Sequence, residues 1–107
     1  MKNWKVRLIK EAHEDFKQLD GSQRKLVLKQ LVKLERDPAY GKALGKKAGI
    51  DLTGFYKLYA DKKRIRIVYT LENDIIKIIA IDKREDMEVY RIAAKRIGEL
   101  KDEGNRG

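Results

Sequence analysis

Cysteine is absent from this 107-residue sequence, and histidine and proline occur only once each. Without cysteine, neither a disulfide nor a thiolate metal site can hold the fold together. With His13 alone, histidine-based zinc sites and paired-histidine catalysis are nearly excluded. The longest apolar stretch, residues 75–81, is interrupted by Lys77 and is too short to cross a membrane. Residues 1–5 lack the apolar run of a signal peptide, and the cytoplasm is therefore the expected compartment.

Acidic residues are outnumbered, since 26 Lys and Arg stand against 17 Asp and Glu and leave a net charge of +9. Such an excess says little about the fold but favours a polyanionic partner, which is most often nucleic acid or otherwise an acidic protein. The length predicts one domain. We place this domain at residues 1–100 and expect residues 101–107, which contain no apolar side chain, to form a flexible tail.

The first half of the chain predicts one strand and two helices. Alternating apolar residues over 4–9 are typical of a strand, and apolar residues at helical spacing follow between 11 and 34. We expect Ser22 to cap the second helix and Asp37-Pro38 to end it. Residues 38–54 contain four glycines and the single proline, a composition that predicts a loop or a weakly structured crossing.

The second half predicts three strands and a final helix. The strands cover 55–60, 64–71 and 75–82, and their short connections indicate antiparallel neighbours. A helical pattern follows from Asp86, which is a plausible N-cap, to Leu100. The sequence therefore predicts an α+β fold of order β-α-α-β-β-β-α, with a small, mostly antiparallel sheet. An N-terminal helical hairpin covers one face of this sheet, and a C-terminal helix completes the fold.

Basic residues gather on one face of the predicted hairpin between the second and third strands. If the turn lies at 61–63, Tyr59 sits opposite Arg66, and Lys57 shares the face of Tyr59. This cationic face, which also carries Arg64, is expected to be open. Like charges on one sheet face repel, so stability alone does not call for them. For any single residue, a solvated strand face with extended Lys and Arg side chains is an equally good interpretation.

A second candidate is the segment KREDMEVY, residues 83–90, which follows the last strand. Arg84 lies in the connection, and Tyr90 lies one turn into the following helix. A structural interpretation competes with the functional one. Asp86 and Glu88 favour the start of a helix through its dipole, and Tyr90 would pack on the core. By spacing alone, the structural interpretation is favoured.

Three segments together resemble the RelE-type toxins of bacterial type II toxin–antitoxin systems. They are YKL at 56–58, RIVY at 66–69 and KREDMEVY at 83–90, and the resemblance extends over roughly residues 2–98. The Arg-x-Val-Tyr strand is shared across the wider RelE/ParE superfamily. The Lys-Arg-Glu…Val-Tyr ending is more typical of its RNA-cleaving branch.

The resemblance implies a RelE-like microbial RNase-type fold and a metal-independent endoribonuclease that cleaves mRNA in the ribosomal A site. In this family the ribose 2′-hydroxyl attacks the adjacent phosphate, so no cofactor is expected. The implied partners are the ribosome, mRNA and a cognate antitoxin, and neither a membrane nor a small-molecule cofactor is among them. Two alternatives remain, a ParE-like gyrase inhibitor and a non-catalytic basic RNA-binding module.

The resemblance also implies roles for single residues. Lys57 matches a catalytic lysine, which we interpret as the base, and Arg66 matches the arginine that stabilises transition-state charge. Arg84 matches an arginine proposed as acid or phosphate ligand, and Tyr90 matches a tyrosine that stacks on or orients the nucleotide. Tyr59 stands where better-known members carry a second lysine, which leaves the assignment of the base open.

A lysine acts as a base only if its pKa falls, and desolvation or neighbouring cations both lower it. The predicted clustering of Lys57 with Arg64 and Arg66 is consistent with that requirement. Further residues are expected to bind RNA rather than to react with it. They are Tyr59, Lys62, Lys63, Arg64 and Lys83. From the same resemblance we expect Arg84→Ala and Tyr90→Ala to keep the fold and lose cleavage.

Overall fold

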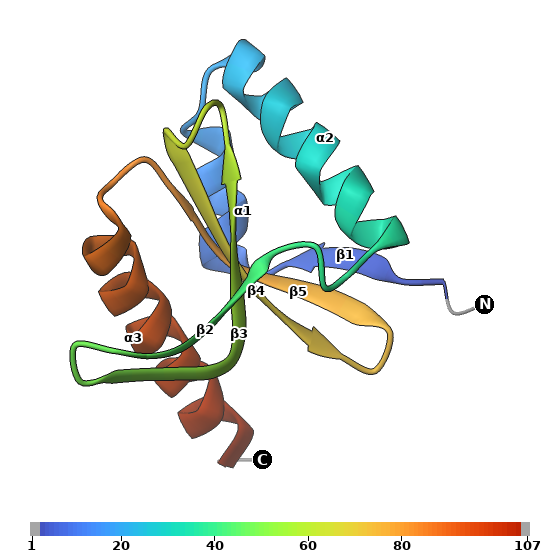
Figure 1. The fold of residues 1–107 in the computed structure, drawn as a ribbon. Coiled ribbons are helices and arrows are strands. Elements are labelled where there is room, and N and C mark those ends of the chain that lie inside the picture. The colour runs from blue at the N-terminus through green and yellow to red at the C-terminus, as the bar shows by residue number, and fades with distance from the viewer. Residues whose placement is uncertain (1–2, 106–107) are drawn as a thin grey trace.

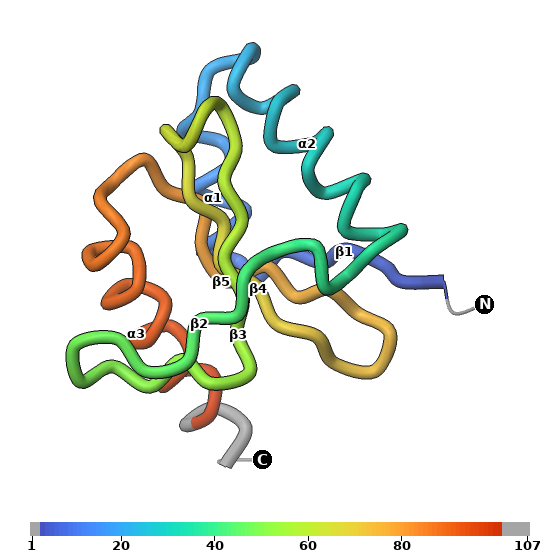
Figure 2. Tube along the Cα trace, in the orientation of Figure 1, coloured from blue at the N-terminus to red at the C-terminus, as the bar shows by residue number. Residues whose placement is uncertain are grey.

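The computed structural model describes residues 3–105 and contains one five-stranded sheet with helices on both faces (Figures 1 and 2). The strand order is β1-β5-β4-β3-β2, in which β1 runs parallel to β5 and all other neighbours are antiparallel. Along the chain the elements are β1 (Lys5–Leu8), α1 (Lys10–Lys17), α2 (Gly21–Arg36), β2 (Lys42–Lys47), β3 (Ile50–Ala60), β4 (Ile65–Glu72), β5 (Ile75–Asp82) and α3 (Asp86–Asn105). The α+β class and the N-terminal helical hairpin are confirmed.

Strand β2 was not predicted, because residues 38–54 were expected to form a loop. In the structure β2 and the first part of β3 form a hairpin that turns at Ala48 and Gly49, both of which have positive φ. Gly45, also at positive φ, lies where the β2–β3 register shifts after Ala43. The glycines therefore serve a turn and an irregularity of the ladder. Glycine content alone does not distinguish these uses from a loop.

Helix α2 begins at a different cap from the one predicted. Asp20, not Ser22, is the N-cap, and its carboxylate accepts a hydrogen bond of 2.8 Å from the backbone N–H of Gln23. The Gln23 side chain accepts in turn from the Asp20 backbone N–H, which completes a capping box. The predicted end of the helix is confirmed, since α2 stops at Arg36, directly before Asp37-Pro38.

Two hydrophobic clusters lie on the two faces of the sheet. Helices α1 and α2 cover one face, where Ile65 and Ile67 are fully buried, as the apolar face of the β3–β4 hairpin predicted. Helix α3 covers the other face, over Val68 and Ile79 (Figure 1). Because α3 lies on the same side as Lys57 and Arg66, the predicted open cationic face is partly covered.

Helix α3 extends further than the domain boundary predicted at residue 100. It continues through Asn105, so residues 101–105 of the expected tail have helical backbone. Residues 106–107 of that tail, and residues 1–2 of the expected domain, lie outside the described residues. None of the helices within residues 3–105 is both long and apolar enough to span a membrane.

Candidate active site

Strands β3 and β4 bring Lys57, Tyr59 and Arg66 together, and we call these three residues the cationic cluster. The predicted register is confirmed, because Tyr59 pairs with Arg66 and Ala60 pairs with Ile65. Lys57 Nζ donates a hydrogen bond of 2.9 Å to the Tyr59 hydroxyl and lies 4.9 Å from the Tyr59 ring centroid. Arg66 Cζ lies 5.7 Å from the same centroid. The Tyr59 ring thus lies within reach of both cations.

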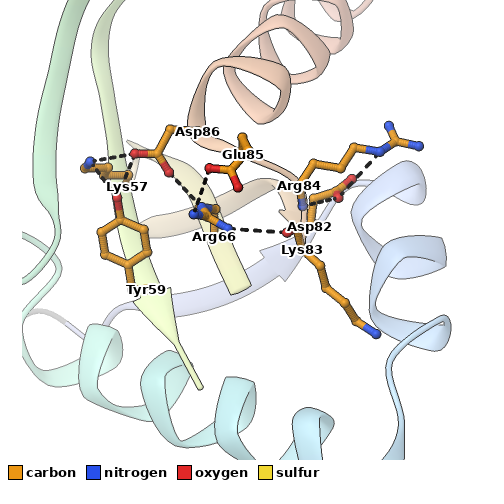
Figure 3. Close-up of polar contacts among 8 residues, drawn as sticks. All are labelled: Lys57, Tyr59, Arg66, Asp82, Lys83, Arg84, Glu85 and Asp86. Carbon is orange, nitrogen blue, oxygen red and sulfur yellow. Dashed lines mark hydrogen bonds and ion pairs between the residues drawn. The ribbon is translucent and has the colours of Figure 1, made fainter. Parts of the chain in front are cut away.

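Asp86, the first residue of α3, directs its carboxylate into the cationic cluster (Figure 3). Its Oδ1 accepts from Arg66 Nε at 2.7 Å. Its Oδ2 accepts from the Tyr59 hydroxyl at 2.8 Å and from Lys57 Nζ at 3.4 Å. One carboxylate therefore contacts all three members of the cluster.

Sequence reasoning treated Asp86 only as a possible helix cap and missed this role. A usable signal was present in the strand pairing, because Arg66 lies opposite Asp82 at the end of β5. Only residues 83–85 separate Asp82 from Asp86 in the sequence. An acidic residue so soon after the strand end therefore lies close to Arg66. Carboxylates within a few residues of a strand end deserve testing against cations on the neighbouring strand.

The cationic cluster is mostly covered, which corrects the expectation of an open face. The side chains of Lys57 and Arg66 are 17% and 14% exposed, whereas that of Asp86 is 33% exposed. Arg66 also donates to the Lys83 carbonyl oxygen at 3.3 Å and lies 3.8 Å from the carboxylate of Glu85. The connection between β5 and α3 thus lies directly against Arg66.

The groups around Lys57 raise its pKa, whereas a lowered pKa had been expected. Burial lowers the pKa of Lys57, but the hydroxyls of Tyr59 and Tyr90 and the charge of Asp86 outweigh burial and raise the pKa above that of an ordinary lysine. For Asp86, burial raises the pKa, and the hydrogen bonds from Arg66 and Tyr59 together with Lys57 bring it below its usual value. The prediction that neighbouring cations lower the pKa of Lys57 is wrong for the free protein, because that prediction did not include the Asp86 carboxylate.

Tyr90 lies on the buried side of α3, in the hydrophobic cluster between this helix and the sheet, and is only 3% exposed. Its ring centroid is 6.0 Å from Lys57 Nζ, and burial raises the pKa of its hydroxyl. The structural interpretation, in which Tyr90 packs on the core, is thereby confirmed. Tyr90→Ala would remove a buried ring and cost roughly 3–5 kcal/mol, so it is unsuitable as a variant that keeps the fold.

The side chains of Arg84 and Lys83 lie apart from the cationic cluster, although the Lys83 carbonyl oxygen contacts Arg66. Arg84 is held near Asp82, whose Oδ1 accepts from the Arg84 backbone N–H at 3.0 Å and lies 3.9 Å from Arg84 Nε. The Arg84 side chain is 61% exposed. In Figure 3 the Arg84 and Lys83 side chains extend away from Lys57 and Tyr59. The structure therefore gives Arg84 no contact with the residues it was expected to assist.

The turn between β3 and β4 carries the other predicted RNA-binding residues. Lys62 and Lys63 are exposed there, and both have positive φ. Lys63 Nζ lies 5.9 Å from the Tyr59 ring centroid, which places this cation at the margin of the cationic cluster. Arg64 had been expected to share the strand face of Arg66. It does not, because it lies before β4 begins and is exposed in the same turn.

The arrangement is suited to bind an anion. A guanidinium, an ammonium and a phenol converge on one point, and the present occupant of that point is a carboxylate. Guanidinium and ammonium groups bind phosphate oxygens through the same charge-assisted hydrogen bonds. Among residues 3–105 there is no group of three or more His, Cys, Asp or Glu that could hold a metal ion.

No protein-family model matches the sequence, and no curated protein matches it. Solved structures do match. A mutant of the E. coli toxin RelE in the free state is 24% identical, with a TM-score of 0.69, over 89% of this chain and 98% of that chain. The intact E. coli RelBE toxin–antitoxin complex is 20% identical, with a TM-score of 0.64, over 77% and 98%. The YoeB dimer from Staphylococcus aureus is 26% identical, with a TM-score of 0.60, over 78% and 99%. These matches show that the chain has the fold of the RelE toxins.

Proposed function

We propose that this chain is the toxin of a type II toxin–antitoxin system and an endoribonuclease that cleaves mRNA on the ribosome. The observation that carries the proposal is the cationic cluster on a sheet of the RelE type. Fold alone does not determine an activity, so the argument depends on the chemistry of the cluster. The reaction that this chemistry fits is an internal transfer at an RNA phosphodiester.

In this reaction the ribose 2′-oxygen forms a bond to the adjacent phosphorus, and the bond from phosphorus to the 5′-oxygen breaks. The 2′-hydroxyl gives up its proton, the leaving 5′-oxygen gains one, and a cyclic phosphate and a 5′-hydroxyl end result. Negative charge develops on the phosphate oxygens in the transition state. Cations fixed beside those oxygens stabilise that charge without reorganising.

Arg66 and Lys57 are the residues placed to stabilise this charge. Arg66 already binds a carboxylate with its Nε, and a phosphate oxygen makes the same contact. Lys57 is protonated in the free protein, so it meets the substrate as a cation. It can act as the base only after the contacts that raise its pKa have been lost. Tyr59 is placed beside both cations to orient a nucleotide by stacking, and Tyr90 supports Lys57 from the core.

The rim of the site supplies further RNA contacts under this proposal. They lie in the turn between β3 and β4 and in the connection between β5 and α3, and all are exposed: Lys62, Lys63, Arg64, Lys83 and Arg84. Of them, Arg84 is the longest exposed side chain on the connection to α3 and is assigned to a phosphate of the bound strand. Because ribosomes and mRNA lie in the cytoplasm, the proposed activity places the protein there.

The test is to induce the chain without an antitoxin and map new mRNA 5′ ends against the reading frame. We expect growth arrest and cuts that fall in register with codons. Arg66→Ala should reduce cleavage at least about 100-fold, because it removes a fixed donor at the developing charge. Arg7→Ala, which removes one exposed charge from β1, is the matched control and should cleave normally.

Two results would contradict the proposal. Growth arrest without new mRNA ends, accompanied by inhibition of gyrase supercoiling, would identify a gyrase inhibitor instead. Absence of arrest from a well-folded protein would identify a non-toxic RNA-binding module. Arg84→Ala, a change at a side chain that is 61% exposed, should bind ribosomes and lose most of its cleavage.

We also propose a cognate antitoxin as partner. The matched structures include a RelBE complex, and the charge of +9 favours an acidic protein. Helix α2 contributes to this charge with five exposed cations. They are Arg24, Lys25, Lys29, Lys33 and Arg36. Co-expression with the product of an adjacent small gene should yield a stable complex. Failure of that product to co-purify would contradict this part of the proposal.

A further inference from the structure

Asp86 occupies the cationic cluster in the way that a bound anion would. Its two oxygens accept hydrogen bonds of 2.7 Å from Arg66, 2.8 Å from Tyr59 and 3.4 Å from Lys57. These donors come from β3 and β4, whereas the carboxylate comes from the start of α3, 20 to 29 residues away in the sequence. The contact therefore exists only while the beginning of α3 lies against the sheet.

A carboxylate and a phosphodiester make equivalent demands on such donors. Each presents two oxygens and about one negative charge, and each satisfies the Nε–H of Arg66 by the same charge-assisted hydrogen bond. The donors cannot serve both anions at the same short distances. With Asp86 in place, one of the two positive charges of Lys57 and Arg66 is already neutralised.

Asp86 is also placed so that it can leave. It follows the irregular residues 83–85 and is the first residue of the helix, and its side chain is 33% exposed. The remainder of α3 has a separate anchor, because Arg96 pairs with Asp15 at 2.6 Å and both side chains are about 15% exposed. The Asp86 side chain can therefore release the cluster while the helix stays on the sheet.

We propose that Asp86 is an internal competitor of the RNA phosphodiester, so that the site admits a phosphate only after the Asp86 carboxylate has withdrawn. The inference rests on the proposed function for the identity of the ligand and assigns a regulatory contact to the same site. Release of Asp86 also removes one of the charges that keep Lys57 protonated.

The experiment titrates inorganic phosphate into the isolated protein and follows the Arg66 Nε–H resonance by NMR, assigned through an Arg66→Lys variant. Asp86→Asn is compared with Glu85→Gln, which makes the same charge change on the neighbouring residue. Glu85 is the matched control because its side chain is 89% exposed and reaches Arg66 only at 3.8 Å. We expect Asp86→Asn to bind phosphate at least about tenfold more tightly than the wild type, and Glu85→Gln to bind within about twofold of it.

Equal affinity in Asp86→Asn and Glu85→Gln would overturn the proposal, because the gain would then be a general charge effect. Weaker binding in Asp86→Asn would also overturn it and would show that the carboxylate positions the cations for an anion. Should Asp86→Asn fail to fold, Asp86→Ser makes the same test, because serine is favoured at helix starts. In the Asp86→Asn background, Lys57→Gln removes the other cation of the cluster and keeps the Arg66 resonance, and it should abolish the gain, which locates the phosphate at the cluster.

The phosphate titration tests the competitor and the mRNA mapping tests the nuclease, so either proposal can fail without the other. Tighter phosphate binding in Asp86→Asn together with an absence of mRNA cuts would retain the competitor and reject the nuclease. Codon-register cuts together with unchanged phosphate affinity would retain the nuclease and reject the competitor.

Discussion

At the residue scale, Tyr69 shows how one buried hydroxyl can order a connection. It donates to the Pro38 carbonyl oxygen at 2.9 Å and accepts from the Gly41 N–H at 2.9 Å. Its ring stacks on Tyr56 with centroids 5.3 Å apart. A Cβ at Gly41 would come within 2.5 Å of the hydroxyl, so this position accepts only glycine without rearrangement. Tyr69 therefore fixes the path of the chain from α2 into β2.

Tyr69 also makes stability depend on pH in the alkaline range. Burial raises the pKa of Tyr69 to about 12, although the hydrogen bond from Gly41 opposes the shift. The unfolded chain loses this proton near pH 10, where the folded chain still holds it. The contribution is complete below pH 10 and is lost as the pH rises toward 12, because the unfolded state then binds fewer protons.

We expect the free energy of unfolding of the wild type to fall by roughly 2 kcal/mol more than that of Tyr69→Phe across this window. Urea unfolding of both proteins below pH 10 and near pH 12 measures the difference. A constant difference between the two proteins would show that the Tyr69 hydroxyl does not titrate with unfolding.

At the element scale, the pair Asp15–Arg96 joins α1, β5 and α3. Strand β1 pairs with β5 only as far as Ile78, which leaves the later residues of β5 without a strand neighbour on that side. Asp15 Oδ2 accepts from the Ile81 N–H at 3.0 Å, and Arg96 Nη1 donates to the Ile79 carbonyl oxygen at 3.0 Å. The ion pair therefore completes the hydrogen bonding of a strand edge and ties two helices to it.

Removal of one partner should be costly. Arg96→Leu would leave the Asp15 carboxylate unpaired at a site where it is 15% exposed, with an expected loss of about 3 kcal/mol. Glu72→Gln is the control, since it breaks the more exposed pair with Lys77 and should cost less than about 1 kcal/mol. Urea denaturation of both variants gives the comparison. Similar losses in both would mean that the buried pair contributes no more than a surface pair.

At the scale of the whole molecule, positive charge lies on both helical layers and at the turn beside the site. The net charge of +9 favours any polyanion, whereas Lys62 and Lys63 are exposed cations of one turn, and Lys63 lies 5.9 Å from the Tyr59 ring centroid. Attraction by the net charge and direct contact with RNA phosphates can be distinguished by how steeply the RNA affinity depends on salt concentration. Each phosphate contact lowers the logarithm of the RNA affinity in proportion to the logarithm of the salt concentration.

We expect Lys62→Gln/Lys63→Gln to reduce the salt slope for a single-stranded RNA oligonucleotide by about 1.4, that is, about 0.7 for each lost contact. Lys5→Gln/Arg7→Gln removes two exposed charges from the edge strand β1 and should change the slope much less. Fluorescence anisotropy at several salt concentrations measures both slopes. Equal reductions would show that RNA responds only to net charge.

The parts of the fold that were predicted depend on local patterns. The alternation in β3 and β4 and the short turn between them are sufficient to pair Tyr59 with Arg66, because a one-residue slip would expose the apolar face. The missed strand β2 depends on its pairing with β3, and its residues, KALGKK, do not alternate between apolar and polar. The cap at Asp20 was missed because Asp20 and Ser22 are both suitable capping residues at neighbouring positions.

The sequence by itself determined the α+β class, the hairpin register and the presence of Lys57, Tyr59 and Arg66 on one sheet face. Only the tertiary structure decided the state of that face. Asp86 lies far from Lys57 along the chain and reaches it only because α3 packs over the same side of the sheet. Side-chain alternation is a property of a few consecutive residues, whereas the charge of a site is the sum over every element that packs against it. For that reason a face that is cationic in sequence is, in the folded protein, already partly neutralised by its own carboxylate.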